Sequence, residues 1–113
     1  FALEDATIEN GCMYFIPGEH RGALKKRNYR ISPTQLQTDT LDASPWPEER
    51  KLPAEASAGA LVIFDGRAPH MSAPNRSDKS RHAYTLHAID RNCHYPAENW
   101  LQRSADLPLR GFT

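Results

Sequence analysis

Two side chains with different chemistry stand eleven positions apart in the segment GALVIFDGRAPHMSAPNRSDKSRHAYTLH, residues 59–87. His70 follows one apolar run, and Arg81 opens the next. A neutral imidazole is a good ligand for Fe(II), and a guanidinium grips a carboxylate through two parallel hydrogen bonds. The pair therefore indicates a site that holds a metal ion beside an organic acid, provided that the fold brings the two residues together.

Each of these residues also has an ordinary structural explanation. A lone histidine near a strand end is more often a polar loop residue or a hydrogen-bonded core imidazole. The setting of His70 favours function, because a rigid strand and Pro69 fix its position and Arg81 begins the next strand. Thr85 shares a strand face with Arg81, where it would either line the site or fill the core. Asp65 is expected to form a turn with the following glycine rather than an acid–base pair with His70.

The elements that must carry these residues are strands. Alternating or continuous apolar residues predict four of them, at residues 1–5, 12–16, 59–65 and 81–90. Asn10-Gly11 is typical of a hairpin turn, and one helical turn is expected at residues 96–102. Strands separated by turns favour an antiparallel sandwich or barrel. Four strands do not close one, so we expect further strands before Phe1 and interpret the chain as the C-terminal part of a longer protein.

Residues 22–57 differ in character from the rest of the chain. Four prolines interrupt a polar, charged stretch that shows no sustained period, namely Pro33, Pro45, Pro47 and Pro53. We predict a long, lid-like loop that selects the substrate, with a short strand at residues 29–31 at most. The four basic residues within it are either a solvated turn or a docking patch for an anionic substrate tail: Lys25, Lys26, Arg27 and Arg30.

Length and charge restrict the class of protein. The 113 residues suffice for one domain, and the formal net charge of zero gives no nucleic-acid footprint. Cys12 and Cys93 have neither a close pairing nor zinc-type spacing, so they are interpreted as reduced thiols. The sequence shows no membrane-length apolar run and no signal peptide. A cytoplasmic protein that acts on a small molecule, without nucleic-acid or membrane partners and of undetermined oligomeric state, is the resulting expectation.

Three ordered stretches carry a resemblance to a known family: ALEDATIENGCMYFIPGEHRG, the segment GALVIFDGRAPHMSAPNRSDKSRHAYTLH, and PAENWLQR near the end. They resemble the C-terminal part of the phytanoyl-CoA dioxygenase family, in particular its domain-containing branch, over nearly all of the chain except residues 22–57. The resemblance implies a mainly β fold, a partial double-stranded β-helix of jelly-roll or cupin type without its N-terminal strands. It also implies an iron(II)- and 2-oxoglutarate-dependent dioxygenase that hydroxylates a small organic or acyl substrate and releases succinate and CO2.

The resemblance assigns roles to individual residues. His70 stands where the family has the distal histidine of its iron-binding triad, which comprises two histidines and one carboxylate. Arg81 stands where the family has the arginine that binds the 5-carboxylate of 2-oxoglutarate, and Thr85 would lie near that cosubstrate. The turn PGEH departs from the usual Pro-Gly-Ser-His through Glu19, and we expect His20 to brace this turn rather than bind metal.

One part of the family pattern is absent from the chain. The other two iron ligands belong to a His-x-Asp motif, and none of the five histidines is followed two positions later by Asp or Glu. The family pattern implies that this motif precedes Phe1. The alternative is a catalytically silent jelly-roll binding module without a complete iron site. A zinc hydrolase is excluded by spacing, because no histidine pair has the arrangement of zincins.

Overall fold

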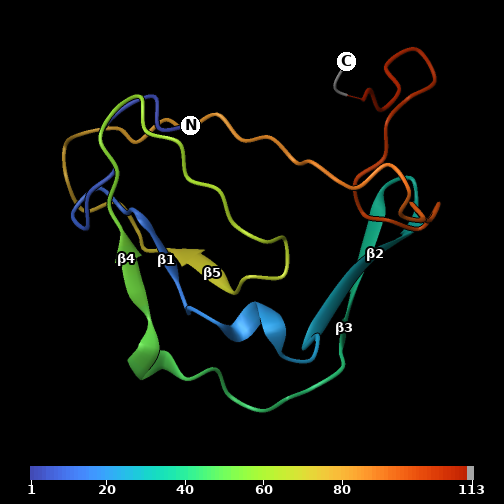
Figure 1. The fold of residues 1–113 in the computed structure, drawn as a ribbon, viewed down its shortest axis with the longest axis horizontal. Coiled ribbons are helices and arrows are strands. Elements are labelled where there is room, and N and C mark those ends of the chain that lie inside the picture. Colours follow the sequence, from blue (N-terminus) through green and yellow to red (C-terminus); the bar gives the residue numbers. More distant parts are fainter. Residues whose placement is uncertain (112–113) are drawn as a thin grey trace. The chain divides into compact units, whose positions relative to one another are not determined.

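A computed structural model describes residues 1–111 of the chain (Figure 1). The fold is mainly β, with small antiparallel sheets and almost no helix, as expected for part of a cupin-like domain. The elements in chain order are β1 (Met13–Phe15), η1 (Glu19–Arg21), β2 (Lys26–Ser32), β3 (Gln35–Thr40), η2 (Glu48–Arg50), β4 (Leu52–Ala54) and β5 (His70–Ser72).

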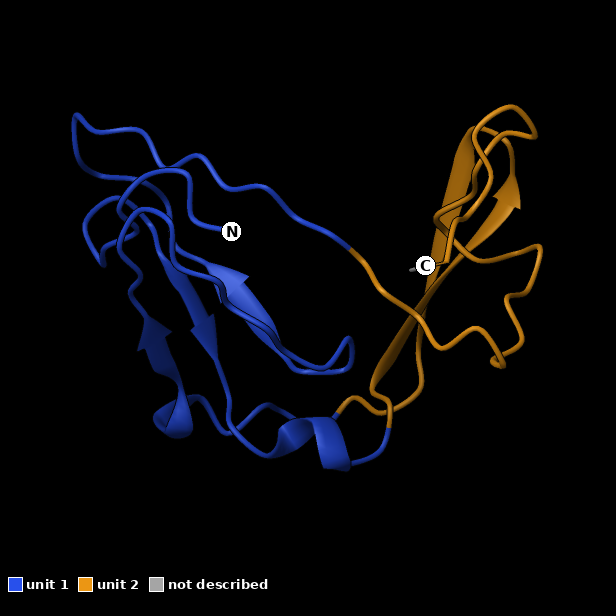
Figure 2. Cartoon of the chain, turned by 45° about the horizontal axis from the view of Figure 1, so that its top comes forward, with its two compact units in different colours: residues 1–23, 44–86 blue, residues 24–43, 87–113 orange. Residues whose placement is uncertain are grey.

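The chain divides into two compact units (Figure 2). The first comprises Phe1–Ala23 and Ser44–Leu86, and the second comprises Leu24–Ala43 and the chain from His87 onward. His70, Arg81 and Thr85 all belong to the first unit, so the candidate site can be described within that unit alone.

The first unit is built on a three-stranded antiparallel sheet in the order β4-β1-β5 (Figure 1). The strand predicted at residues 12–16 is confirmed as β1, which ends before Pro17. In the register of the sheet, Phe15 lies opposite His70, and Met13 lies opposite Ser72. The strand β5 was not predicted as a separate element, and it is the element that carries the candidate metal ligand.

Three predicted strands are absent as regular elements from residues 1–111. Residues 1–5 and 81–90 meet only in an isolated bridge between Ala2 and Ala83, supported by backbone hydrogen bonds from Leu3 to His82 and from Tyr84 to Phe1. Residues 59–65 form no strand, and four consecutive apolar side chains there are exposed: Leu61, Val62, Ile63 and Phe64. A strand needs a neighbour that completes its hydrogen bonds. Within residues 1–111, no segment forms a continuous ladder of hydrogen bonds with any of these three.

The Asn10-Gly11 pair forms a turn, as predicted. The Cys12 amide donates to the Thr7 carbonyl at 2.8 Å, and Gly11 has a φ of 85°, which glycine adopts without strain. The expected hairpin is wrong, however, because β1 pairs with β4 and β5 and not with the strand predicted before the turn. A Cβ added at Gly11 would lie 2.5 Å from the Ala73 carbonyl oxygen, so this turn packs directly on the chain that follows β5.

We expect Gly11→Ala to destabilise the protein more than Gly59→Ala. Both glycines have a φ near 85°, but a Cβ at Gly59 meets no atom within 4 Å. Gly59→Ala should cost about 1–2 kcal/mol of unfolding free energy through backbone strain alone. Gly11→Ala adds the clash with Ala73 and should cost about 1–3 kcal/mol more. Urea-induced unfolding measures both values, and equal losses would contradict the close packing of the turn.

Residues 22–57 are not a structureless loop, which corrects the sequence-based prediction. They contain β4 and the hairpin of β2 and β3, which includes the short strand expected at residues 29–31. The hairpin is largely exposed on both faces, and polar residues occupy both. Its sequence therefore lacks the alternation of apolar and polar residues by which a strand is predicted. β4 contains Pro53 and lies at the edge of its sheet, where proline is tolerated. The role of these residues as a lid stays a prediction.

The second unit holds its C-terminal segment against β2. Arg30 accounts for two of the contacts, a backbone hydrogen bond to the Glu98 carbonyl at 2.6 Å and one from its Nη2 to the Trp100 carbonyl at 2.7 Å. The turn expected at residues 96–102 is present without a helix: the Asn99 amide donates to the Pro96 carbonyl, and the Gln102 side chain donates to the Pro96 and Asn99 carbonyls.

Two further sequence features have a simple outcome. Cys12 and Cys93 are both free, the first buried and the second exposed. Across residues 1–111, the structure has no helix of the length and apolar character needed to cross a membrane.

Candidate active site

His70 presents one ring nitrogen for ligand binding. It begins β5, and its Nδ1 lies 2.8 Å from the Ala68 carbonyl oxygen. A carbonyl only accepts hydrogen bonds, so this contact favours the tautomer in which Nδ1 carries the proton and Nε2 keeps a free lone pair. The rings of Phe64 and Phe15 lie 5.0 and 5.9 Å from the imidazole, measured between centroids. A carbonyl and two aromatic rings thus orient a nitrogen suited to bind a metal.

Arg81 is partly buried and keeps its charge available. Its Nη2 donates to the Ser72 Oγ at 3.3 Å, and no carboxylate of residues 1–111 forms an ion pair with it. Burial raises the pKa of the Cys12 thiol, and the positive charge of nearby Arg81 partly offsets this rise. A partly desolvated guanidinium without a carboxylate partner is a favourable position for an external anion.

The sheet brings His70 and the Arg81 guanidinium to the same side. Residues two apart on a strand share a face, so His70 and Ser72 lie on one face of β5 and Met71 lies on the other. Arg81 reaches the Ser72 hydroxyl, and Lys51 Nζ lies 3.9 Å from the Met71 sulfur on the opposite face. His70 and Arg81 therefore approach one surface of the sheet through Ser72.

Ser72 was not identified from the sequence. A serine two residues after a histidine gains meaning only once both are known to lie on one strand, and β5 was not predicted. The signal that could have found it is the period of two between the imidazole and the hydroxyl.

Thr85 does not join this group, since it is exposed. It has no described hydrogen bond or ring contact with His70 or Arg81, and its exposure also contradicts the alternative that it fills the core.

Asp65 forms a turn, as predicted, whereas the expectation that His20 braces the PGEH turn stays a prediction. The Asp65 carboxylate accepts the Arg67 amide at 2.8 Å, and this hydrogen bond is the main reason why the pKa of Asp65 is lowered. In the PGEH turn, the Glu19 Oε1 pairs with the Arg50 Nη1 at 2.6 Å. His20 lies next to Glu19 in η1.

The set of possible metal ligands is incomplete. Within residues 1–111, no three residues among His, Cys, Asp and Glu lie close enough together to hold a metal ion. His70 fits one position in an iron site by its free Nε2 and its fixed ring, and these residues offer no complete site around it.

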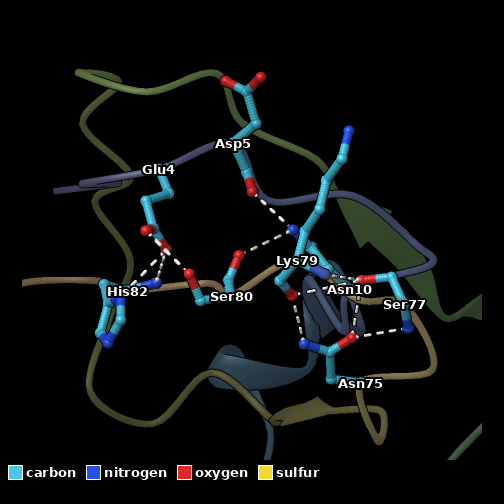
Figure 3. A network of polar contacts seen from close by, with 8 residues as sticks. All are labelled: Glu4, Asp5, Asn10, Asn75, Ser77, Lys79, Ser80 and His82. Carbon is cyan, nitrogen blue, oxygen red and sulfur yellow. Dashed lines mark hydrogen bonds and ion pairs between the residues drawn. The ribbon is translucent and has the colours of Figure 1, made fainter.

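The segment around Arg81 is held by Glu4, from the other end of the unit. The Glu4 carboxylate accepts the His82 amide at 2.8 Å, the His82 Nδ1 at 3.0 Å and the Ser80 hydroxyl at 2.9 Å (Figure 3). These hydrogen bonds favour the charged carboxylate, and the His82 amide makes the largest contribution to lowering the pKa of Glu4. Both chain neighbours of Arg81 are therefore tied to one ionised side chain.

The lowered pKa of Glu4 predicts a loss of stability in acid. A carboxyl group whose pKa is lower in the folded protein stabilises the fold fully above its unfolded pKa, and this contribution disappears as the pH falls through the folded value. We expect the unfolding free energy of the wild type to fall more between about pH 6 and about pH 3 than that of Glu4→Gln. Urea titrations at both pH values measure the difference, and parallel losses would contradict an ionised Glu4 in this network.

Comparison with known proteins places the chain in a family. The sequence profile described as Phytanoyl-CoA dioxygenase (PhyH) matches residues 1–83. The chain belongs to the phytanoyl-CoA dioxygenase family. The match runs through residues 22–57, which the three motifs quoted above do not cover, and it includes His70 and Arg81.

Curated relatives agree with this assignment. Phytanoyl-CoA dioxygenase domain-containing protein 1 of Danio rerio is 40% identical over 111 residues, which cover 96% of this chain and 38% of the relative. Its counterpart in Bos taurus is 39% identical over the same shares. Phytanoyl-CoA dioxygenase 1 of Oryza sativa subsp. japonica is 42% identical over 104 residues, 90% of this chain and 36% of the relative. The chain thus spans little more than a third of the length of these relatives.

Proposed function

We propose that this chain contributes one iron ligand and the cosubstrate anchor to an iron(II)- and 2-oxoglutarate-dependent dioxygenase. The reaction hydroxylates a C–H bond of a small organic or acyl substrate. One oxygen atom of O2 enters the hydroxyl group, and the other enters succinate as 2-oxoglutarate loses CO2. Family membership indicates a dioxygenase and hence an oxidoreductase. The observation that supports the finer proposal is the approach of His70 and Arg81 to one face of the sheet through Ser72.

In this proposal His70 is an iron ligand through Nε2. Its Nδ1 stays bound to the Ala68 carbonyl at 2.8 Å, which keeps the ring from rotating when the metal leaves. Phe15 from β1 and Phe64 from the segment before β5 both contact the ring, which further restricts its orientation.

Arg81 binds the 5-carboxylate of 2-oxoglutarate. The planar guanidinium offers parallel N–H groups to the two carboxylate oxygens. The Ser72 hydroxyl, 3.3 Å from Nη2, keeps the tip of the side chain on the His70 face before the cosubstrate arrives. A dicarboxylate of the length of 2-oxoglutarate would then extend from Arg81 toward the metal at His70.

The remaining iron ligands would come from outside residues 1–111, because these residues contain no three-ligand group. When bound, iron would supply the activation of dioxygen. The residues described here bind and orient: His70 fixes one coordination position, and Arg81 fixes one end of the cosubstrate.

The longest reading frame that contains these 113 residues should be tested for 2-oxoglutarate turnover. We expect Fe(II)-dependent release of succinate and CO2, even in the uncoupled reaction without the substrate. Mn(II) in place of Fe(II) is the control, since it should support cosubstrate binding without turnover. A protein that is loaded with Fe(II) but neither binds nor consumes 2-oxoglutarate would overturn the proposal.

A binding module without catalysis is the second candidate, and the incomplete ligand set of residues 1–111 is the observation that favours it. Calorimetry on the 113-residue chain with Mn(II) and 2-oxoglutarate separates the two. If the iron ligands of a dioxygenase are divided between segments, the 113-residue chain should bind the metal weakly, and the protein encoded by the longer reading frame should bind it tightly. Weak binding in both would favour the binding module.

A further inference from the structure

Two residues near the N-terminus hold the main chain on both sides of Arg81. Glu4 contacts Ser80 through its hydroxyl and His82 through its amide and its ring. Asn10 contacts the Ser80 carbonyl from the other direction. Figure 3 shows Glu4 facing His82 and Ser80, and Asn10 lying between Ser80 and Asp5. The two side chains lie more than 70 positions from Arg81 in sequence.

Asn10 is the only buried polar residue within residues 1–111, with 4% of its surface exposed. Its Nδ2 donates to the Asp5 carbonyl at 2.8 Å and to the Ser80 carbonyl at 3.3 Å. Its Oδ1 accepts the Thr7 amide at 2.7 Å. Every polar atom of the amide group is therefore bound, as a buried amide requires. One of these bonds reaches the residue that immediately precedes Arg81.

Arg81 needs such support, because it does not lie in a regular strand. The segment that carries it has a single bridge, between Ala83 and Ala2. An arginine side chain carries about 2 kcal/mol of rotamer entropy, so it binds a carboxylate well only when its main chain and its tip are both fixed. Ser72 contacts the tip, and Glu4 and Asn10 fix the main chain at residues 80 and 82.

The neighbouring turn at residues 75–79 does not need Glu4 or Asn10 for its own hydrogen bonds. The Asn75 Nδ2 donates to the Lys79 carbonyl at 2.7 Å, and the Asn75 Oδ1 accepts the Ser77 amide at 2.9 Å. The side chains of Glu4 and Asn10 instead contact the residues that follow this turn. Their contacts therefore determine where the chain leaves the turn, which is where Arg81 stands.

We propose that Glu4 and Asn10 are positioning residues for Arg81, and that they set the affinity of the site for the dicarboxylate cosubstrate without contacting it. The inference rests on the proposed function, in which Arg81 binds 2-oxoglutarate. Its consequence is selective: weakening either contact lowers the affinity for 2-oxoglutarate and leaves metal binding at His70 unchanged, because β5 is held separately by β1.

The test compares Glu4→Gln with Asn75→Ala in the longest reading frame that contains the chain. Glu4→Gln keeps the size of the side chain and removes its charge. We expect the KM for 2-oxoglutarate to rise about threefold to tenfold, with unchanged kcat at saturating cosubstrate and unchanged half-saturation by Fe(II). Asn75→Ala breaks the adjacent turn without touching residues 80 or 82, so it should lower the melting temperature and leave this KM unchanged.

A double variant provides the readout that a purely structural role would not move. Once Arg81→Ala has removed the guanidinium, Glu4→Gln should cause no further rise in the KM for 2-oxoglutarate. Asn10→Asp gives a second, independent variant, because it keeps the acceptor for Thr7 and loses the amide that donates to Ser80 and Asp5. Rises in KM for Asn10→Asp and Glu4→Gln, both absent in the Arg81→Ala background, would support the proposal.

Three outcomes would overturn it: a wild-type KM in folded Glu4→Gln, an equal rise in Asn75→Ala, or additive effects of Glu4→Gln and Arg81→Ala. These differ from failure of the proposed function, which would be seen in the wild-type protein as loss of any response to 2-oxoglutarate. If the proposed function fails in this way, the positioning role proposed for Glu4 and Asn10 is also wrong.

Discussion

His70→Ala should abolish iron-dependent succinate formation in the longest reading frame that contains this chain. Loss of a residue that merely orients a metal ligand typically costs 10- to 100-fold in metal affinity or activity, so loss of the ligand itself should cost more than about 100-fold. The imidazole is exposed and its hydrogen bond goes to a neighbouring carbonyl, so the fold should survive. Succinate release and Fe(II) binding by calorimetry measure the two effects.

His94→Ala is the matched control for this variant. His94 is also exposed and belongs to the second unit, so its removal should change neither turnover nor iron binding. Wild-type turnover in His70→Ala would contradict the assignment of the iron ligand. Loss of turnover with normal Fe(II) affinity would also contradict it, because the two losses must occur together.

Arg81→Ala should raise the 2-oxoglutarate concentration needed for half-maximal turnover by about 10- to 100-fold. A hydrogen bond to a charged group contributes about 1.5–3 kcal/mol, and each 1.4 kcal/mol corresponds to about a tenfold change in affinity. Arg81→Lys should lie between the wild type and Arg81→Ala, because lysine keeps the charge and lacks the planar fork. Initial rates over a range of cosubstrate concentrations provide the measurement.

Arg76→Ala controls for the loss of one positive charge near the site. Arg76 is exposed in the same connection between His70 and Arg81, and its described contact is a backbone hydrogen bond to Glu9 that alanine keeps. Its half-saturating concentration should equal that of the wild type. An unchanged value for Arg81→Ala, or an equal rise in Arg76→Ala, would show that the guanidinium of Arg81 does not anchor the cosubstrate.

The sequence predicted elements that depend on local signals. The run Cys-Met-Tyr-Phe-Ile between Gly11 and Pro17 is apolar, rich in aromatic residues and bounded by turn residues, and it becomes β1. The run Leu61–Phe64 has an equally strong pattern and forms no strand, because a strand is a property of a pair and residues 1–111 give it no partner. The opposite error occurred for β2 and β3, whose polar faces concealed a regular hairpin.

The sequence alone indicates those candidate site residues whose chemistry is distinctive for a single side chain. An imidazole after a strand and a guanidinium after the following loop are distinctive, so the sequence singles out His70 and Arg81, whose roles stay predictions. Ser72, Glu4 and Asn10 could not be singled out, because the contacts on which their proposed roles depend join separate segments of the chain. The hydrogen bonds of Glu4 and Asn10 to Ser80 span 76 and 70 positions, and no local pattern encodes such distances.

Because Phe15 pairs directly with His70, the candidate site depends on the register of β5 against β1. Deleting one residue within β5 would shift its pairing with β1 by one position and turn His70 to the side of Met71, away from Arg81. Adding residues to the exposed turn at 75–79 would leave that pairing intact. Natural or engineered relatives of this chain should therefore vary in the length of the turn and keep the two-residue step from imidazole to hydroxyl.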